Sequence, residues 1–276
     1  MKHFIRIIIV MLSISVTYGQ TSELGVFVGS SYYVGELTNS YFSNPKSAGG
    51  VIYRYNISPR WAFKGTALFG SLEASDKETN SNNPRNLSFR SPLSELSLQM
   101  EFHFFRLYNE TEKNPFTPYI FGGISAFSFN PQAKYDDNWY DLQPMGTEGQ
   151  GIDKYPEPYS LTSISIPFGL GLKINFLKRF TFGAEWGLRK TFTDYIDDIS
   201  GVYVDKTVLQ YNNPEIISLL ADRSEIAHKP GSARGLSTNN DWYGFLGFWL
   251  TFKLTNDDNG CSSYSTRKIR KKVLNR

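Results

Sequence analysis

Two histidines, His103 and His228, are the residues of this 276-residue chain best suited to transfer protons, and many serines and acids could serve beside them. A hydrolase would need one of these histidines next to a serine and an acid in a recognisable frame. His103 lies in a strand-like segment, His228 lies in a distant loop, and neither belongs to a G-x-S-x-G frame. We therefore expect no enzymatic activity, and a membrane-barrel lipase or protease is the remotest alternative.

Acidic clusters offer a second kind of chemistry. Asp136 and Asp137 are adjacent, and Asp194 precedes the pair Asp197 and Asp198. Carboxylates bind calcium, but neither cluster has the ligand spacing of a calcium loop. Solvated loop charge is the favoured interpretation, and no metal or cofactor is expected.

A third set of polar residues lies in the middle of segments with alternating polarity. Its members are Arg54, Lys64, Glu95, Glu101, His103, Lys173, Glu185 and Arg189. On a strand such residues share one face, and unpaired charges there would be costly to bury. We expect the basic members to neutralise the acidic ones across an enclosed interior. A proton or ion path is the alternative.

The segment from Ser94 to Phe104 shows what positions these residues. Its even-numbered members from Leu96 to Phe104 are apolar, whereas its odd-numbered members from Glu95 to His103 are polar or charged. Only a β-strand, with a side-chain period of two, separates these sets. An apolar row on one face and charges on the other are typical of a membrane barrel, with lipid outside and a polar lumen inside.

Similar segments recur along the chain. Their approximate extents are Glu23 to Gly35, Gly50 to Ile57, Trp61 to Ser71, Ser94 to Phe105, Thr117 to Phe129, Leu161 to Phe176, Phe180 to Phe192 and Trp242 to Leu254. The first and fifth are ambiguous because glycines blur their two faces. The pattern predicts an all-β fold, a transmembrane antiparallel up-and-down barrel of about eight strands.

The connections between these segments alternate in length. Short turns follow the second and sixth segments, whereas long polar loops occupy 36–49, 72–93, 130–160 and 193–241. Short periplasmic turns and long extracellular loops are typical of outer-membrane barrels, so both chain ends are expected in the periplasm. The alternative is a soluble β-sandwich with one wet face.

Aromatic residues near the segment ends argue against the sandwich, because they could form interfacial girdles. They are Trp61, Tyr119, Phe129, Phe176, Phe180, Trp242 and Phe252.

The two ends of the chain differ from the middle. Residues 1–19 combine Lys2 and Arg6 with an apolar run and a small residue, Gly19, which predicts a secretory signal peptide. Residues 20–254 would form the barrel, and residues 255–276 a basic periplasmic tail. The net charge of +3 is too small to indicate nucleic-acid binding, and the single cysteine, Cys261, excludes an intrachain disulfide.

Candidate partner contacts lie in the third loop and the tail. The loop residues Trp139, Tyr140 and Leu142 are of a buried type, so they either pack into a cap over the barrel or mark a protein contact. The tail residues are Arg267, Lys268, Arg270, Lys271 and Lys272. They could bind an acidic partner or anionic headgroups, whereas the alternative is a solvated, disordered tail.

Several longer strings occur in a fixed order. They are Arg85 to Pro92 (RNLSFRSP), Phe116 to Tyr119 (FTPY), Phe129 to Pro131 (FNP), Trp139 to Pro144 (WYDLQP), Gly146 to Gly151 (GTEGQG), Phe168-Gly169, Glu185 to Gly187 (EWG) and Arg189 to Tyr195 (RKTFTDY). With them the chain, from about Leu24 to Ser200, resembles the PorG family, outer-membrane β-barrel components of the type IX secretion system of Bacteroidetes.

The resemblance implies a small barrel without enzymatic activity. It also implies association with the periplasmic ring of PorK and PorN, protein export and, in many members, gliding motility. Outer-membrane lipid and the ring proteins are thus the expected partners, with no nucleic acid and no small-molecule substrate. The family supplies no catalytic residue. The alternative function is a free-standing surface adhesin or narrow porin.

Overall fold

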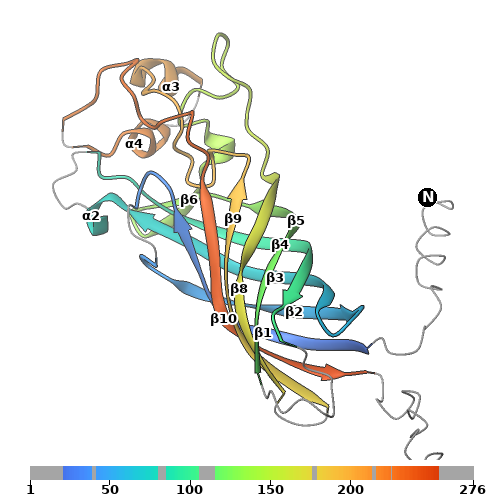
Figure 1. Cartoon of the computed structure of the whole chain (residues 1–276). Coiled ribbons are helices and arrows are strands. Elements are labelled where there is room, and N and C mark those ends of the chain that lie inside the picture. The colour runs from blue at the N-terminus through green and yellow to red at the C-terminus, as the bar shows by residue number, and fades with distance from the viewer. Residues whose placement is uncertain are drawn as a thin grey trace, which may run out of the picture.

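Eight long antiparallel strands close into a barrel in the computed structural model, which describes residues 21–38, 42–79, 85–105, 116–175, 179–212, 216–224 and 226–254 (Figure 1). The strands are β1 (Thr21–Val34), β2 (Lys46–Asn56), β3 (Trp61–Ser75), β4 (Ser88–His103), β5 (Phe116–Phe129), β8 (Thr162–Asn175), β9 (Phe180–Thr191) and β10 (Trp242–Lys253). Each strand pairs with its neighbour along the chain, and β10 closes onto β1. The predicted eight-stranded up-and-down barrel is confirmed.

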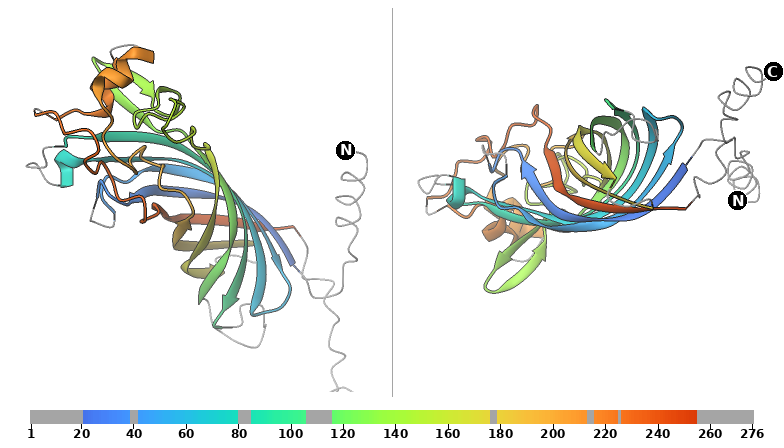
Figure 2. Two further views of the ribbon diagram at one scale, coloured as in Figure 1. Left: turned by 90° about the horizontal axis from the view of Figure 1, so that it is seen from above. Right: turned by 60° about the horizontal axis from the view of Figure 1, so that its bottom comes forward.

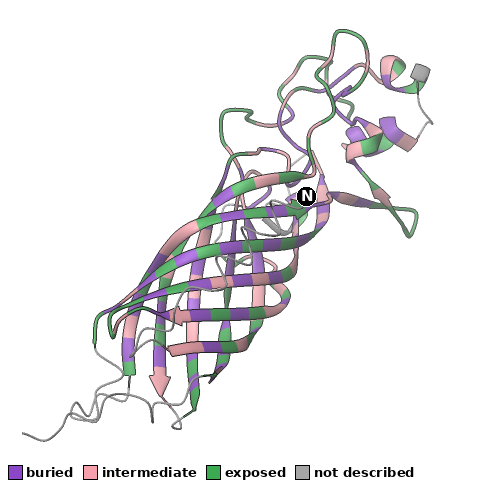
Figure 3. Cartoon of the chain, turned by 90° about the vertical axis from the view of Figure 1, so that its right-hand side faces the viewer, coloured by how far each residue is buried: buried purple, intermediate pink, exposed green. Residues whose placement is uncertain are grey.

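The barrel is apolar outside and polar or aromatic inside. On β4, Leu96 and Leu98 are 68% and 56% exposed, whereas Glu95 and Glu101 on the other face are buried. Figure 3 shows this alternation as bands of exposed and buried residues along each strand. A soluble sheet would bury the apolar row, so this surface is suited to lipid.

The two ends of the barrel differ. We call the end with the connections 57–60 and 176–179 the turn end, and the opposite end the loop end. Glu23 near the start of β1 is in register with Lys253 at the end of β10, so the barrel begins and finishes at the turn end. The four long connections gather at the loop end, as the alternation of their lengths predicts (Figure 2).

Strands β3 and β4 extend further than the sequence predicts. They stay paired as far as Ser75 and Ser88, so the second long connection is shorter than the predicted 72–93. Leu72 and Phe89 on these extensions are buried, and they belong to the same core cluster as Ile196 of the fourth loop. Contact with this cluster explains why β3 and β4 continue beyond the part of the barrel that faces lipid.

The third and fourth loops fold into a cap beyond the loop end. The elements of the cap are the hairpin β6 (Gln132–Tyr135) and β7 (Asn138–Asp141), the turn η1 (Gln143–Met145) and the helices α3 (Lys206–Asn212) and α4 (Ile216–Ala221). Helix α2 (Asp76–Thr79) follows β3. Among the described helices, none has the length and apolar character needed to cross a membrane.

Two of the predicted girdle residues face the interior. Tyr119 and Phe129 of β5 are 1% and 3% exposed, so placing them at the lipid interface was wrong. They share the parity of Phe121 and Phe127, and this row fills the barrel with aromatic side chains. The sequence does not reveal which face of β5 points inward, because both faces carry apolar residues and Gly122 and Gly123 interrupt the alternation. Trp61 and Phe180 are exposed, and Phe176 lies outside the described residues.

Candidate functional site

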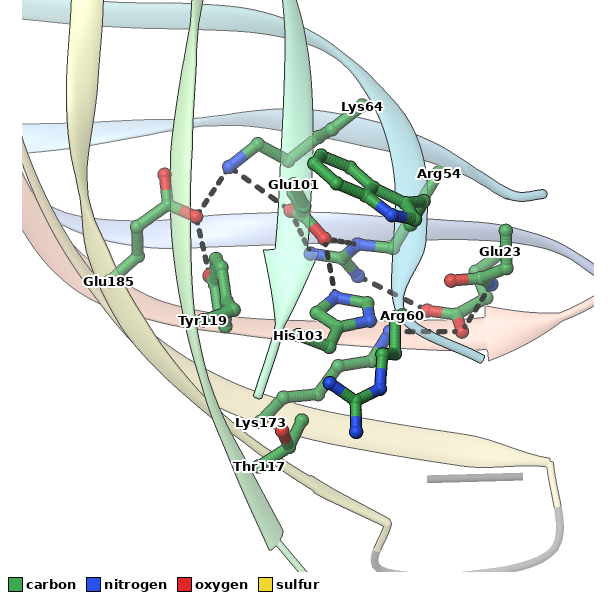
Figure 4. Close-up of polar contacts among 12 residues, drawn as sticks. Glu23, Arg54, Arg60, Lys64, Glu101, His103, Thr117, Tyr119, Lys173 and Glu185 are labelled. Carbon is green, nitrogen blue, oxygen red and sulfur yellow. Dashed lines mark hydrogen bonds and ion pairs between the residues drawn. The ribbon is translucent and has the colours of Figure 1, made fainter. Parts of the chain in front are cut away.

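Glu101 is the centre of a buried ion-pair network near the turn end (Figure 4). Its two carboxylate oxygens accept hydrogen bonds from Arg54 Nε and Nη2 at 2.8 and 3.0 Å. Lys64 Nζ lies 3.3 Å from Oε1, and His103 Nε2 lies 3.1 Å from Oε2. All four side chains are fully buried. Strands β2, β3 and β4 thus bring four of the sequence-predicted residues together.

Glu23 is a second centre, which sequence reasoning missed. Its carboxylate lies 3.1 Å from Arg54 Nη1 and 3.3 Å from Lys173 Nζ, and Thr251 donates a hydrogen bond to it at 2.8 Å. Gly25 and Gly29 blur the faces of β1, which is why Glu23 was overlooked. Its parity with Phe27, and the cation at Arg54 on the next strand, were the signals that could have revealed it.

Glu185 completes the network from β9. Lys64 Nζ lies 2.5 Å from its carboxylate, and Tyr119 donates a hydrogen bond to the same oxygen at 2.6 Å. Trp249 Nε1 in turn donates to the Tyr119 hydroxyl at 3.1 Å. Tyr119, which the sequence placed at the lipid interface, is therefore part of the network.

A separate cluster lies nearer the loop end. Arg189 Nε and Nη2 donate to the two oxygens of Glu95 at 3.0 and 3.1 Å, and Tyr243 donates to the same carboxylate at 2.8 Å. These residues come from three strands that are not all neighbours. The cluster therefore cross-links the barrel through its interior.

Aromatic rings cover three of the buried cations. The Arg54 guanidinium lies 4.2 Å from the centre of the Trp249 ring, and Lys64 Nζ lies 4.1 Å from that of Phe121. Arg189 lies 4.7 Å above Phe245. A cation held by both a carboxylate and a ring is stabilised in a dry interior, because each partner replaces part of the lost hydration.

The charges of these ion pairs balance. In the network, Glu23, Glu101 and Glu185 face Arg54, Lys64 and Lys173, and elsewhere Glu95 faces Arg189. His103 reaches Glu101 through Nε2, which assigns the ring proton to that nitrogen. Within the described part of the chain, no group of three or more His, Cys, Asp or Glu side chains could hold a metal ion. The arrangement can fill and rigidify the barrel.

His228 lies among catalytic residue types but in the wrong geometry. Its Nδ1 lies 3.1 Å from Asp222 and 3.2 Å from Ser224 Oγ, and Ser224 also donates to Asp222. A catalytic relay needs the acid and the nucleophile on opposite ring nitrogens. Both partners share one nitrogen here, and the ring stacks on Tyr203 at 4.2 Å. The cluster therefore stabilises the fourth loop.

A buried polar cluster links the cap to the barrel. Arg234 Nη1 lies 2.9 Å from Glu148, whose carboxylate also accepts the backbone amides of Ser200 and Gly201 at 2.9 Å each. Asp198 accepts a hydrogen bond from Tyr159 at 2.6 Å and one from Thr147. Burial raises the pKa of Asp198 to about 6, while Arg234 opposes that rise.

Two further acids of this cluster share one hydroxyl. Tyr33 Oη lies 2.7 Å from Asp197 Oδ2 and 2.5 Å from Asp241 Oδ1. Burial raises the pKa of both carboxyls well above the usual range. One phenol proton serves one acceptor, so the second short contact needs a proton on a carboxyl. The sequence treated Asp194, Asp197 and Asp198 as solvated loop charge, but they are buried, and burial raises the pKa of Asp194 to about 7.

The predicted partner contacts fall in different environments. Trp139 is 41% exposed on β7, with the Arg90 guanidinium 4.0 Å from its ring centre, and Tyr140 is half-buried. Leu142 is 3% exposed and packs with Ala133 and Leu220, so it stabilises the cap and does not face a partner. The tail residues Arg267, Lys268, Arg270, Lys271 and Lys272 and Cys261 lie outside the described residues.

A closed barrel with an apolar exterior and an interior of paired charges is a transmembrane β-barrel of the outer-membrane type. The chain belongs to the family described as Domain of unknown function (DUF6089), whose model matches residues 2–216. No curated protein matches it in sequence.

Solved structures similar to this chain are outer-membrane and surface proteins. A major outer membrane protein from Thermus thermophilus is 10% identical, with a TM-score of 0.42, and the match covers 86% of this chain and 100% of that chain. Neisserial surface protein A is 10% identical, with a TM-score of 0.41, and the match covers 86% and 97%. The N-terminal barrel domain of Pseudomonas aeruginosa OprF is 11% identical, with a TM-score of 0.37, and the match covers 85% and 98%.

Proposed function

We propose that this protein is a non-enzymatic outer-membrane component of the type IX secretion machinery, which anchors or aligns the periplasmic ring. The observation that carries this proposal is the filled interior. Arg54 and Trp249 lie against each other in the lumen, and the ion pairs around them are balanced. A barrel filled in this way does not conduct solutes. Its useful surfaces are then its rims, its loops and its chain ends.

The resemblance to the PorG family supports the partner assignment, with ring proteins of the PorK and PorN type as the partners. Both barrel ends lie at the turn end, because Glu23 pairs with Lys253. With the short turns in the periplasm, this end faces the ring, and the basic residues 255–276 follow β10 in the sequence. Their cations would bind an acidic face of the ring or anionic headgroups.

Copurification tests the proposal. The full chain, tagged in its cap, is extracted with mild detergent from the membranes of its own cell, and we expect the large periplasmic ring subunits to be recovered with it. A matched variant lacks residues 255–276 and should recover less of them. Recovery of the barrel without ring subunits would contradict the proposed association with the ring. Unchanged recovery with the shortened chain would show that residues 255–276 do not contribute to that association.

A surface adhesin is the second candidate, and the β6–β7 hairpin favours it. This hairpin places Trp139 and Tyr135, 41% and 38% exposed, on the cap. Exposed aromatic residues are typical binding anchors. A Trp139→Ala variant that loses cell-surface attachment but keeps secretion would favour the adhesin. Loss of secretion with attachment unchanged would favour the machinery component.

A further inference from the structure

A basic pocket of about 500 Å³ lies in the cap, on the side of helix α2. Four cations line it: Lys77 of α2, Lys134 of β6, Lys206 of α3 and Arg223 after α4. They come from four separate segments of the chain. The volume falls in the range of small-molecule sites. Nothing in the barrel interior or in the proposed secretion role uses this pocket.

The positive charge of the pocket has little compensation. Asp222 is the acid in its lining, and its oxygens already accept hydrogen bonds from His228 N and Ser224 N at 2.8 and 3.2 Å. Lys134 pairs at 2.7 Å with Asp137, which is almost fully exposed, so this ion pair is weak. Among the described residues, no carboxylate lies within ion-pair distance of Lys77, Lys206 or Arg223.

Arg223 is held in place as a preformed donor. Its Nη1 donates to Ser88 Oγ at 2.8 Å, and its Nη2 donates to the carbonyl of Lys134. Its own carbonyl accepts a hydrogen bond from Asn86 at 3.3 Å. Burial lowers the pKa of Arg223, with only Tyr135 opposing the effect. A half-buried guanidinium without a carboxylate partner is stabilised when an anion binds beside it.

The rest of the lining suits a sugar. Ser88 and Asn86 offer hydroxyl and amide groups, and Tyr135 and Leu219 add partly exposed apolar surface. Hydroxyl and amide groups exchange hydrogen bonds with sugar hydroxyls, and an aromatic face covers the apolar side of a sugar ring. An acidic peptide would bind through the cations alone and would not need the hydroxyl, amide and aromatic groups. The combination therefore favours a ligand that carries both a phosphate and a sugar.

We propose that the basic pocket binds a phosphorylated saccharide, with its phosphate on Arg223 and the three lysines and its sugar over Tyr135. The ligand is bound and not converted, so the site is compatible with a protein that has no enzymatic activity. It can come from a phosphorylated glycolipid of the surrounding membrane or from a soluble glycan. Neither source depends on the secretion role.

Calorimetry of the folded full-length chain in nanodiscs tests the site, with glucose 1-phosphate, glucose and inorganic phosphate as probes. We expect glucose 1-phosphate to bind more tightly than either part alone, and added salt to weaken it. Lys77→Ala with Lys206→Ala should raise its Kd about tenfold, because two charge-assisted contacts are lost. Arg223→Lys should also weaken binding, because the fork is lost while the charge remains.

Lys154→Gln is the matched control, since this exposed loop cation is not part of the pocket, and it should leave the Kd unchanged. Equal binding by the lysine double variant and the parent chain would overturn the proposal, as would tighter binding of a poly-glutamate peptide than of glucose 1-phosphate. Nanodiscs with a phosphorylated glucosamine lipid separate the sources. Competition by this lipid points to the membrane, and retained binding without competition points to a soluble glycan; both outcomes support the assigned ligand class.

Discussion

Arg54 and Glu101 form a two-point contact inside the barrel, with Nε–Oε2 and Nη2–Oε1 distances of 2.8 and 3.0 Å. They belong to β2 and β4, which are separated by β3, so the contact spans a strand through the lumen. Both side chains are fully buried. Neither charge has access to water, and each therefore depends on the other.

Neutralising Glu101 should destabilise the barrel strongly. A Glu101→Gln variant leaves Arg54 and Lys64 with fewer negative partners, and breaking a buried ion pair costs about 3–5 kcal/mol. The measurement is denaturant unfolding of the purified barrel in detergent. Glu157→Gln is the control, because Glu157 is exposed in the third loop. If both variants unfold at the denaturant concentration of the parent chain, the network is not a major source of stability.

Gly183 should not tolerate a side chain, because it lies against the network's largest ring. A Cβ at this position would lie 2.3 Å from Trp249 Cζ2 and 2.6 Å from the backbone oxygen of Leu172. Gly183→Ala should therefore destabilise the barrel by about 1–3 kcal/mol, measured by the same unfolding assay. Gly122→Ala is the matched control, since its nearest neighbour would be 3.9 Å away. Equal effects of the two substitutions would contradict the packing described for Trp249.

The cap should loosen as the pH rises. Asp197 and Asp241 have raised pKa values, and those of Asp194 and Asp198 lie at about 7 and about 6. The folded cap therefore holds protons that the unfolded loops release above about pH 4. The stability that these protons provide is present at low pH and is lost as the pH rises through about 6 to 7 and beyond. Limited proteolysis of the cap at pH 5 and pH 8 measures this change.

Asp241→Asn should flatten that pH dependence. The amide can donate a hydrogen bond to Tyr33 Oη while Tyr33 donates to Asp197, so the variant reproduces the protonated pair. We expect slower cleavage of the cap at pH 8 than in the parent chain. Asp153→Asn, on an exposed loop residue, should change nothing. An unchanged ratio of cleavage rates in the Asp241 variant would show that the pair does not hold the proton.

The barrel should not conduct ions, with or without residues 203–232 of the fourth loop. Val202 and Ala233 form a backbone bridge, so residues 203–232 can be replaced by a short Gly-Ser link between adjacent points. The side chains that fill the lumen, including Arg54, Lys64 and Trp249, come from strands and stay in place. Planar-bilayer recordings should show no steady conductance for either protein. Steady conductance of the parent chain would favour the narrow porin. Conductance of the shortened chain alone would show that residues 203–232 seal the barrel.

The strands could be predicted from the sequence because side-chain alternation is local. Between Leu96 and Phe104, the period of two alone shows which residues lie on each face of the strand. The alternation of short and long connections then gives the order of the strands. The same reasoning placed Arg54, Lys64, Glu95 and Glu101 on the inner face. It failed for Glu23 and Tyr119, because glycines or apolar residues on both faces of their strands remove the local signal.

The sequence by itself determined the strands, their inner and outer faces and the charges that face inward. The tertiary structure decided which charges meet: Glu101 with Arg54 and Lys64, and Glu23 with Lys173 across the interior. It also buried Asp197 and Asp241 around Tyr33 and brought Lys77 and Arg223 to one pocket. The reason is physical. Alternation depends on neighbours along one strand, whereas these contacts depend on register and closure, which many distant residues set together.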